Sequence, residues 1–433
     1  MIKNRLIRWG YTLLLALLSP IFLWGLYRSK ANKPQFGSRW KEHFGITPPL
    51  SHSDQGVIWI HAVSVGEVLS SRGLIKALSE QYPHRRILIT TTTSTGAQQV
   101  KAFDPLLEHR YMPIDFSYCI ESFLRRIKPS VLLIIETELW PNTLHTVARF
   151  GIPIIVVNGR LSEKSLDNYR KLSALIRPAL THITCLLSVH QQDAQRFESL
   201  GVAKEKIWVT GSLKYDITLD PALPSQAGHL REQLGNHRAI FIAASTHEGE
   251  DEQVLAAYRD AKSHIPELLL VLVPRHPERF NSVAELILQQ GFNLARRTKQ
   301  DSEKLADTVD VYLADTMGEM MLLLAASDVV FMGGSLLGKK VGGHNFIEPA
   351  ILAKPIFTGP SFFNFADLAR QLISSKALMV IDNPQHLAQS IVNCLQNSNS
   401  WQSKAQAGYD IVIQNQGALQ KTMQAIMPII ERE

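Results

Sequence analysis

Cysteine is scarce in this sequence. Only three cysteines occur, and they stand far apart at Cys119, Cys185 and Cys394. None belongs to a Cys-x-x-Cys pair, and an odd number cannot be fully paired within one chain. The sequence therefore argues against a disulfide scaffold and a cysteine-based zinc site, and it favours a reducing compartment.

Three nucleotide-binding signatures are also missing. No Gly-x-Gly-x-x-Gly follows the first expected strand, which argues against a dinucleotide-dependent oxidoreductase. Neither a Walker A sequence nor an Asp-x-Asp triplet occurs. Without that acidic clamp we expect no metal and no cofactor. Helix ends, Arg275 and Lys214 are expected to stabilise negative charge instead.

Excess charge is confined to the N-terminus. The formal net charge is +6, but residues 1–42 alone contribute +7, so the remaining chain is close to neutral at −1. A nucleic-acid-binding protein more often spreads its charge over a folded face, so we expect no nucleic-acid partner. The basic residues of this segment are Lys3, Arg5, Arg8, Arg28, Lys30, Lys33, Arg39 and Lys41.

The one long apolar run, Tyr11–Tyr27, lies inside this basic segment. It is slightly short for a membrane span, which needs about 20 apolar residues, and Pro20 is expected to kink a helix there. A cleaved signal peptide, a tilted span and a helix lying in one leaflet all remain open, although residues 29–31 are a weak cleavage site. We expect residues 1–30 to form a retained membrane anchor. The basic flank places the large domain in the cytoplasm, facing anionic lipids.

Short β-branched runs alternate with amphipathic stretches over the rest of the chain, which is typical of βαβ units and a parallel sheet. Helical patterns include Val68–Glu80 and Asp193–Leu200. The expected strands are Val57–Ala62, Ile87–Thr91, Val131–Ile135, Ile152–Val157, Leu186–Val189, Ile207–Thr210, Ala239–Ala244, Leu268–Val273, Val311–Leu313, Val329–Met332 and Pro355–Phe357.

The fold class predicted from this alternation is α/β, with two doubly wound, Rossmann-like domains facing a cleft. Thr218–Gln226, which contains two prolines, is the expected linker. We therefore divide the chain into an anchor at 1–30, an N-terminal domain at 31–217, a C-terminal domain at 218–400 and a helical segment at 401–433. The last segment is expected to pack back toward the N-terminal domain. Ligands bind such sheets beyond the carboxyl ends of the strands, so the residues there carry the functional information.

Carboxylates follow two strands of the first half. Ser64, Gly66 and Glu67 come after the first strand, where Gly66 is expected to permit a tight turn. Glu67 either complements the dipole of the next helix or serves as a general base. Glu136 and Glu138 follow the strand Val131–Ile135. Two carboxylates at the mouth of a buried strand are costly unless they are paired, for example with Arg160, or are functional.

Lys214 ends the last strand of the N-terminal domain and brings a cation to the same edge; it is otherwise an ordinary surface lysine. In the second half, Ser245 and Thr246 open a helix and suit a phosphate or carboxylate, unless they only form a capping box. Two prolines then fix the loop that carries Arg275 and His276, and arginine is a natural partner of anionic oxygens.

Further strand-end loops of the second half also suit a nucleotide. One carries Met317, Gly318 and Glu319. Glycine-rich stretches at 333–335 and 342–343 permit close backbone approach to a phosphate. Asn345 and Glu348 are expected one helical turn apart on one face, where a carboxylate often binds ribose. Each loop alone is a weak signal, but together they predict a nucleotide site.

In order along nearly the whole chain, seven motifs resemble the Kdo (3-deoxy-D-manno-octulosonic acid) transferase family. They are His-x-Val-Ser-Val-Gly-Glu at 61–67, Glu-Thr-Glu-Leu-Trp-Pro-Asn at 136–142, Gly-Ser-Leu-Lys-Tyr-Asp at 211–216, Ser-Thr-His-Glu-Gly-Glu at 245–250, Pro-Arg-His-Pro-Glu-Arg-Phe at 274–280, Asp-Thr-Met-Gly-Glu at 315–319 and Gly-Gly-His-Asn at 342–345.

The resemblance implies a GT-B fold and an inverting transfer of Kdo from CMP-Kdo to an acylated, phosphorylated glucosamine disaccharide, a lipid A precursor. It implies the cytoplasmic face of a Gram-negative inner membrane. It also implies Glu67 as catalytic base, with Glu136 and Lys214 as transition-state stabilisers. The family's CMP contacts fall on Pro274, Arg275, Met317, Gly318, Glu319, Asn345, Phe346, Ile347 and Glu348.

Two other classes stay open from the sequence. One is a different GT-B enzyme that uses another nucleotide sugar. The other is a membrane-tethered protein that binds a nucleotide sugar without catalysis.

Overall fold

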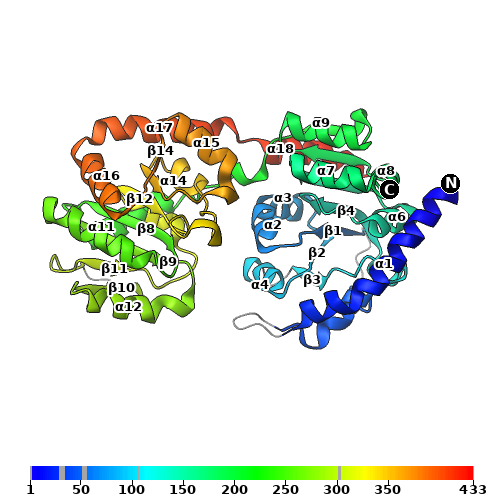
Figure 1. Ribbon diagram of the computed structural model, residues 1–433, viewed down its shortest axis with the longest axis horizontal. Coiled ribbons are helices and arrows are strands. Elements are labelled where there is room, and N and C mark those ends of the chain that lie inside the picture. Colours follow the sequence, from blue (N-terminus) through cyan, green and yellow to red (C-terminus); the bar gives the residue numbers. More distant parts are fainter. Residues whose placement is uncertain (1, 29–34, 51–55, 105–106, 301–303, 433) are drawn as a thin grey trace. The chain divides into compact units, whose positions relative to one another are not determined.

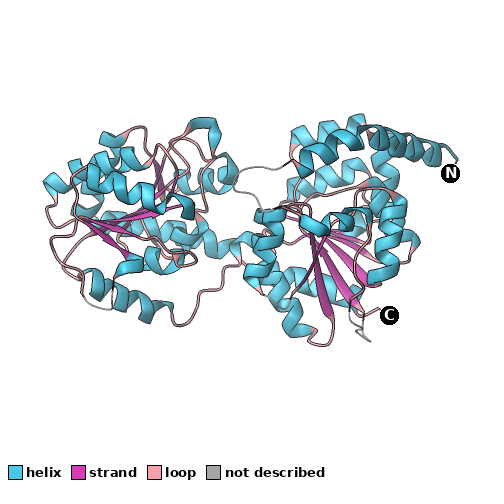
Figure 2. Ribbon diagram, turned by 90° about the horizontal axis from the view of Figure 1, so that it is seen from below, coloured by secondary structure: helices cyan, strands magenta, loops and turns pink. Residues whose placement is uncertain are grey.

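The computed structural model describes residues 2–28, 35–50, 56–104, 107–300 and 304–432. The chain forms two compact units (Figures 1 and 2). Unit 1 comprises the residues up to Asp216 and those from Asn415 onward, and unit 2 comprises Ile217–Gln414. The expected C-terminal segment, 401–433, is thus divided at residue 415 between the two units.

Unit 1 is built on a seven-stranded sheet in the order β3-β2-β1-β4-β5-β6-β7, and all of its pairings are parallel. The order reverses between β1 and β4, which is the point where such sheets bind ligands. The strands are β1 (Val57–His61), β2 (Arg86–Thr91), β3 (Glu108–Tyr111), β4 (Pro129–Ile135), β5 (Ile154–Gly159), β6 (Cys185–Ser188) and β7 (Ile207–Val209).

Both faces of this sheet are buried. Trp59 of β1 belongs to one core cluster, while its neighbours Ile58 and Ile60 belong to the other, as the alternation of side chains along a strand requires. The helices are α1 (Ile2–Tyr27), α2 (Val65–Ser70), α3 (Arg72–Gln81), α4 (Ser94–Phe103), α5 (Ser117–Ile127), α6 (Pro141–Arg149), α7 (Glu163–Lys171), α8 (Ser173–Leu180), α9 (Gln191–Leu200) and α18 (Ala418–Ile430), with 3₁₀ helices η1 (Gly37–Phe44), η2 (Lys204–Lys206) and η3 (Leu213–Tyr215).

Unit 2 repeats this architecture. Its seven strands pair in parallel in the order β10-β11-β9-β8-β12-β13-β14, so the order reverses between β8 and β12. The strands are β8 (Ile240–Thr246), β9 (Leu269–Pro274), β10 (Leu294–Arg296), β11 (Val311–Leu313), β12 (Val329–Met332), β13 (Ile356–Thr358) and β14 (Leu378–Val380).

Helices also cover the sheet of unit 2 (Figure 1). They are α10 (Leu223–Leu234), α11 (Asp251–His264), α12 (Phe280–Gln289), α13 (Met320–Ala325), α14 (Ile347–Ile351), α15 (Ala366–Ser374), α16 (Pro384–Gln396) and α17 (Ser398–Gln414), with 3₁₀ helices η4 (Pro277–Arg279), η5 (Arg297–Lys299), η6 (Gly338–Lys340) and η7 (Phe363–Phe365).

The structure confirms the two doubly wound α/β domains and every predicted strand to within about two residues at either end. The sequence missed the three short edge strands β3, β10 and β14. The helical pattern predicted at Val68–Glu80 is two helices, because the chain bends at Ser71 between α2 and α3.

The predicted linker Thr218–Gln226 is wrong in its second half, because α10 begins at Leu223. Pro224 stands in the first turn of α10, where the missing N–H of proline costs nothing. At the N-terminus, Arg5–Tyr27 of α1 is long and apolar enough to cross a membrane, with a mean hydropathy of 1.7. The expected end of the anchor at residue 30 and the weak cleavage site at residues 29–31 lie outside the described residues.

Candidate active site

The switch point of unit 1 brings two of the predicted carboxylates to one edge of the sheet. β1 and β4 are hydrogen-bonded neighbours, so the residues that follow them share the edge formed by the carboxyl ends of the strands. Glu67 lies in α2 directly after β1, and Glu136 directly follows β4. The charges of Glu136 and Glu138 both act on Glu67, which places all three carboxylates in one region.

Hydrogen bonds orient the carboxylate of Glu67. Val63 N–H donates to Glu67 Oε2 at 2.7 Å, and the hydroxyl of Ser64 donates to Oε1 at 3.0 Å. Ser64 also caps α2, since its Oγ accepts from the backbone N–H of Glu67 at 3.3 Å. The arrangement is a capping box, so Glu67 does interact with the start of its helix, but it is also held rigidly at the switch point.

Burial is the main cause that raises the pKa of Glu67 to about 7; the negative charges of Glu136 and Glu138 act in the same direction, and the two hydrogen bonds oppose them. Its side chain is only 8% exposed. A carboxyl group with a pKa near neutrality is well matched to the work of a general base at physiological pH.

Gly66 does not have the predicted role. It lies within α2 at an ordinary helical position and is absent from the glycines with positive φ. A Cβ at this position would meet Ser64 Oγ at 3.8 Å, which is an ordinary contact. The tight turn expected at Gly66 is therefore wrong, because the capping box of Ser64 and Glu67 already turns the chain from strand into helix.

Glu136 is paired with Lys214. The Nζ of Lys214 lies 3.1 Å from Glu136 Oε1, and both side chains are about one-third exposed. Lys214 belongs to η3, which Asn158 positions by accepting the backbone N–H of Leu213 at 3.2 Å. The predicted cation and carboxylate therefore meet, although 78 residues separate them in sequence.

Backbone strain marks the same region. Glu136 has φ +61°, a left-handed conformation that costs a glutamate roughly 1 kcal/mol or more, and Asn158 has φ +58°, which asparagine tolerates better. These two residues stand at the carboxyl ends of the neighbouring strands β4 and β5. Such strain persists where surrounding contacts enforce it, and it is concentrated at functional sites.

Glu138 lies close by with a different partner. Its Oε2 accepts from Trp140 Nε1 at 2.8 Å, and burial raises the pKa of Glu138. The ring of Trp140 packs edge-on against His61, 5.5 Å away between centroids. In the loop between the two glutamates, Thr137 donates its hydroxyl to the carbonyl oxygen of Arg160. That bond links the loop after β4 to the loop after β5.

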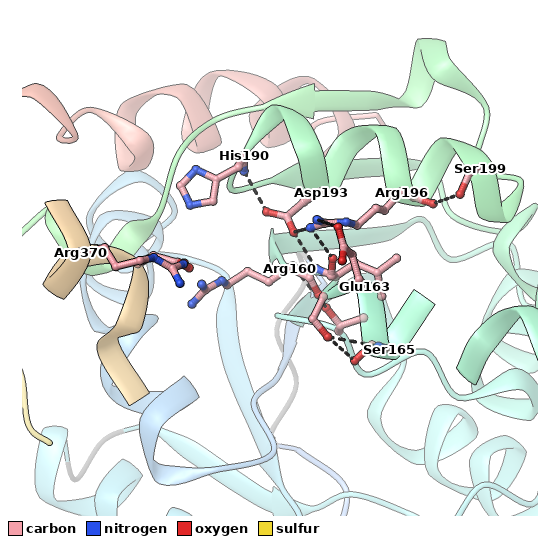
Figure 3. Close-up of polar contacts among 12 residues, drawn as sticks. Arg160, Glu163, Ser165, His190, Asp193, Arg196, Ser199 and Arg370 are labelled. Atoms are coloured by element: carbon pink, nitrogen blue, oxygen red, sulfur yellow. Dashed lines mark hydrogen bonds and ion pairs between the residues drawn. The ribbon is translucent and has the colours of Figure 1, made fainter. Parts of the chain in front are cut away.

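The loop after β5 is itself fixed to α9 (Figure 3). Asp193 is at the centre: its carboxylate accepts from Leu161 N–H at 2.9 Å and from His190 N–H at 3.2 Å. Arg196 donates to the carbonyl oxygen of Leu161 at 3.0 Å and lies 3.4 Å from Glu163. These contacts hold the loop that supports Thr137, and hence the loop of Glu136.

The switch point of unit 2 is organised by a buried carboxylate. Glu250 is fully buried and accepts from the backbone N–H groups of Gly334 at 2.6 Å, Ser335 at 2.8 Å and Leu336 at 2.9 Å. A fourth N–H, from His247, donates to it at 3.0 Å. The glycine-rich loop after β12 is thus tied to the loop after β8.

Replacing Glu250 with alanine is expected to destabilise unit 2 by about 3 kcal/mol or more, because several buried N–H groups lose their acceptor. Thermal unfolding followed by calorimetry measures the loss. Glu252→Ala is the matched control, since Glu252 stands in the same helical turn but is exposed. Equal melting temperatures for the two variants would contradict the stabilising role of Glu250.

Ser245 and Thr246 differ in their roles. Ser245 has φ +59°, and a Cβ on Gly333 would meet its carbonyl oxygen at 2.7 Å, so the loops after β8 and β12 approach as closely as glycine allows. The hydroxyl of Thr246 donates to Asp251 at 2.7 Å, and Asp251 also pairs with Arg279. Thr246 is therefore engaged within the protein and fully buried.

Basic and aromatic side chains cluster beside these loops. His247 Nε2 lies 2.8 Å from His344 Nε2, and their rings are stacked 5.1 Å apart. His276 packs edge-on against His247, and the charge of Arg275 acts on both His247 and His344. Burial lowers the pKa of His344 to about 3, so this ring is neutral, whereas Arg275 brings a permanent positive charge to the cluster.

The segment from Asn345 to Glu348 lies at the same edge. Asn345 precedes α14 rather than lying within it, so the predicted helical spacing is wrong, yet its Nδ2 still donates to Glu348 Oε1 at 3.1 Å. Burial raises the pKa of Glu348. Phe346 and Ile347 are almost completely buried, so their side chains serve the core of unit 2.

Two arginines that the sequence reasoning overlooked fix the loop of residues 315–319. Arg297 donates to both oxygens of Glu319, at 2.6 and 2.5 Å, and Arg296 donates to Asp315 at 2.7 Å. Hydrogen bonds from Arg297 lower the pKa of Glu319. Met317 is 58% exposed, and Gly318 has φ +87° with open space around it. Ion pairs therefore hold the loop at Asp315 and Glu319, while Met317 and Gly318 between them are exposed.

The remaining predicted residue, Pro274, ends β9, and Arg275 N–H donates to the carbonyl oxygen of Thr246 at 2.9 Å. The strand-end loops of β8, β9, β11 and β12 therefore contribute the predicted donor residues. Across the described ranges, no group of three His, Cys, Asp or Glu side chains has the arrangement to hold a metal ion.

Comparison with known proteins agrees with the motifs. Residues 38–217 match the family model for 3-deoxy-D-manno-octulosonic-acid transferase (kdotransferase). The chain is 36% identical to the 3-deoxy-D-manno-octulosonic acid transferase of Haemophilus influenzae, over 98% of this chain and 99% of that protein. It is 32% identical to the enzyme of the same name from Bordetella pertussis, over 96% of this chain and 98% of that protein.

A solved structure supports the fold. The UDP-GlcNAc 2-epimerase of Neisseria meningitidis, bound to UDP-GlcNAc, aligns with 86% of this chain and 99% of its own length at a TM-score of 0.56. Its sequence identity is 14%, so the likeness concerns the architecture of two Rossmann-like domains alone.

Proposed function

The chain belongs to the 3-deoxy-D-manno-octulosonic acid (Kdo) transferase family and is a glycosyltransferase, and from this premise we propose the substrates and the mechanism. The donor is CMP-Kdo, and the acceptor is the acylated, phosphorylated glucosamine disaccharide of a lipid A precursor (lipid IVA). The observation that carries the proposal is the carboxylate of Glu67, held at a topological switch point by Val63 and Ser64 with a pKa of about 7.

The proposed reaction is a single in-line displacement. Glu67 accepts the proton of the primary hydroxyl of the distal glucosamine, and the oxygen attacks the anomeric carbon of Kdo. The bond between that carbon and the phosphate oxygen breaks as the new bond forms, and its electron pair leaves with CMP. Because the attack and the departure occur on opposite faces, the anomeric configuration is inverted.

Lys214 and Glu136 support this step from the same edge of unit 1. The ammonium group of Lys214 offsets the negative charge that develops on the departing phosphate, and its contact with Glu136 at 3.1 Å holds it in place. Glu138 is proposed to contact the acceptor sugar. Ser64 acts through Glu67 as a positioning residue, because its hydroxyl donates to the carboxylate.

The nucleotide is proposed to bind to the strand-end loops of unit 2. The guanidinium group of Arg275 suits the phosphate, the N–H groups of the open loop at 317–319 suit the base or ribose, and Glu348 suits a ribose hydroxyl. His276 and Ser245 are proposed as further donor contacts. Phe346 and Ile347 would take part only through their backbone, because their side chains are buried.

Arg275→Ala is expected to weaken CMP binding about tenfold or more, because a charge-assisted contact to the phosphate is lost. Isothermal titration of the purified protein with CMP measures the change. Arg259→Ala serves as control, since Arg259 is exposed on α11 and donates to Gln290. An unchanged dissociation constant for Arg275→Ala would remove this residue from the donor site.

The decisive test of the reaction is mass spectrometry of the products after incubation with CMP-Kdo and the tetra-acylated lipid A precursor. The expected result is a product heavier by one or more Kdo residues, with CMP released in equal amount. Inhibition by UDP and not by CMP would favour another nucleotide sugar. Binding of CMP-Kdo without any product would favour a binding protein without catalysis.

We further propose that the protein acts at the cytoplasmic face of the inner membrane. The acceptor is a lipid, and α1 is a candidate membrane helix. The basic residues that flank it, Arg5 and Arg28, suit the anionic lipids of that face.

A further inference from the structure

The outer side of α1 is uniformly apolar. Between Leu6 and Gly25, every exposed residue of the helix is apolar. Six of them recur every three or four residues, so they form one continuous stripe along a helix. This outer stripe consists of Leu6, Trp9, Leu13, Leu17, Ile21 and Trp24, and each of these residues is more than 60% exposed.

Three polar residues of α1 contact other segments of unit 1. The hydroxyl of Tyr11 donates to the buried carboxylate of Asp115 at 2.9 Å. Asn142 donates from Nδ2 to the hydroxyl oxygen of Thr12 at 3.0 Å. Near the other end of the helix, the hydroxyl of Tyr27 bonds to His43 Nδ1 at 2.8 Å. These three contacts fix the helix along its length.

The contact at Asp115 and Asn142 is itself part of a rigid structure. Asp115 accepts from the N–H groups of Asn142 at 3.1 Å and Thr143 at 2.6 Å, which caps the start of α6. The same two residues then hold Tyr11 and Thr12. Since α1 also packs against α6 and α8, its first half is docked on the surface of unit 1 (Figure 1).

An open pocket of about 700 Å³ lies beside the end of α1 and η1. Its lining combines apolar side chains, such as Leu23, Phe36 and Trp40, with polar ones, such as Gln35 and Thr93.

From these contacts we propose that α1 does not cross the membrane but lies in its plane, with the outer stripe inserted into one leaflet and unit 1 resting above it. The partner of this surface is the lipid bilayer. Trp9 and Trp24 belong to the stripe, and a helix in this orientation keeps both indole rings near the headgroup boundary that they prefer; Arg5 and Arg28 flank the stripe.

A transmembrane course conflicts with the docking of α1. Arg8 faces unit 1 close to Arg149, and Arg149 forms an exposed ion pair with Glu121 at 3.2 Å. If the docked helix crossed the bilayer, this part of unit 1 would enter the hydrocarbon, where charged side chains are strongly disfavoured. An in-plane helix leaves these charges in water.

Depth measurements distinguish the two arrangements. The protein's own three cysteines are buried, so a nitroxide label can be placed on cysteines introduced singly at Leu6, Leu13 or Ile21. After reconstitution in vesicles that contain anionic phospholipid, an in-plane helix gives nearly equal depths for the three labels. A spanning helix gives depths that change steadily by about 1.5 Å per residue, or about 22 Å from position 6 to position 21. That gradient would overturn the proposal.

Flotation with the same vesicles tests the outer stripe directly. Leu13→Glu combined with Leu17→Glu is expected to reduce the bound fraction at least about tenfold. Leu288→Glu combined with Ile413→Glu is the matched control, because both residues are exposed and apolar but belong to unit 2. Equal binding by the two variants would contradict the proposal. A dimer in detergent that buries the outer stripe between two copies would also contradict it, because the partner would then be protein and not lipid.

These measurements need no catalysis. The inference refines the membrane location given under the proposed function, and it does not depend on the reaction. A protein that binds in plane but yields no Kdo product would refute the proposed function and leave the membrane surface standing.

Discussion

The substitution Glu67→Gln is expected to lower the turnover number for Kdo transfer by at least about 100-fold, because an amide cannot accept the proton of the attacking hydroxyl. Glutamine keeps the shape of the side chain, and its carbonyl oxygen can still accept the N–H of Val63, so the fold should survive. The rate is measured with saturating donor and acceptor. Glu80→Gln, at an exposed position on α3, is the control. A folded variant at position 67 with near-normal turnover would rule out Glu67 as the base.

The pH dependence gives a second signature of the same group. The pKa of Glu67 is about 7, and only the ionised form can act as a base. Turnover of the natural protein should therefore rise as pH increases through about 7, and the residual activity of Glu67→Gln should lack this rise. Ser64→Ala removes a hydrogen bond that lowers this pKa, so it should move the rise to higher pH. A pH profile that is unchanged in both variants would contradict the assignment.

As pH rises, the contribution of Glu67 to the free energy of unfolding should fall, whereas turnover should rise. Because folding raises the pKa of Glu67 above its ordinary value, the folded protein holds this proton more tightly than the unfolded chain does. The stabilisation that the protonated group contributes is fully present below the ordinary pKa, and it is lost as pH rises toward 7. In denaturant titrations between pH 5 and pH 8, the free energy of unfolding should therefore fall less for Glu67→Gln than for the natural protein.

Lys214→Met is expected to reduce turnover by roughly 100- to 1,000-fold while changing the Michaelis constant for the donor little. The charge on the departing phosphate develops mainly in the transition state, so a cation that offsets it acts mainly there. Methionine preserves most of the length and apolar contact of lysine and removes the charge. Lys204→Met, at an exposed position on η2, is the control. A main effect on the donor's Michaelis constant would mean that Lys214 serves binding instead.

The partner of Lys214 can be tested in the same assay. If the contact with Glu136 holds Lys214 in place, the double variant Glu136→Gln/Lys214→Met should lose much less turnover than the product of the losses in the two single variants. Independent, multiplying effects would indicate that the two residues act separately.

The buried strands of both sheets could be predicted from the sequence because their side chains are apolar on both faces. The continuous run Val131–Ile135, for example, is the centre of β4. The missed strands β3, β10 and β14 lie at the edges of their sheets, where they are short and pair on one side only. β3 reads Glu-His-Arg-Tyr, and no apolar pattern reveals it. Its pairing with β2 depends on contacts that are distant in sequence.

The candidate site was predictable to the extent that its residues directly follow strands. Glu67, Glu136 and Lys214 were found in this way. The supporting residues were not, because Asn158, Arg296 and Arg297 act through partners from other segments. Glu250 stood in a recognised motif, but nothing in the sequence shows that its carboxylate reaches the loop after β12. Such pairings arise from the order of strands in the sheet, and sequence spacing does not encode them.

The last residues of the chain, from Asn415 onward, belong to unit 1, and this has a consequence for synthesis on the ribosome. Ile426 and Ile430 of α18 complete a core cluster that also contains residues of β1 and α3. Roughly 200 residues of unit 2 are translated between Asp216 and Asn415, which takes about 10–40 s at 5–20 residues per second. During that interval unit 1 has already emerged, with α1 first, but its core lacks the last helix. We therefore expect newly made unit 1 to need protection from aggregation until translation ends.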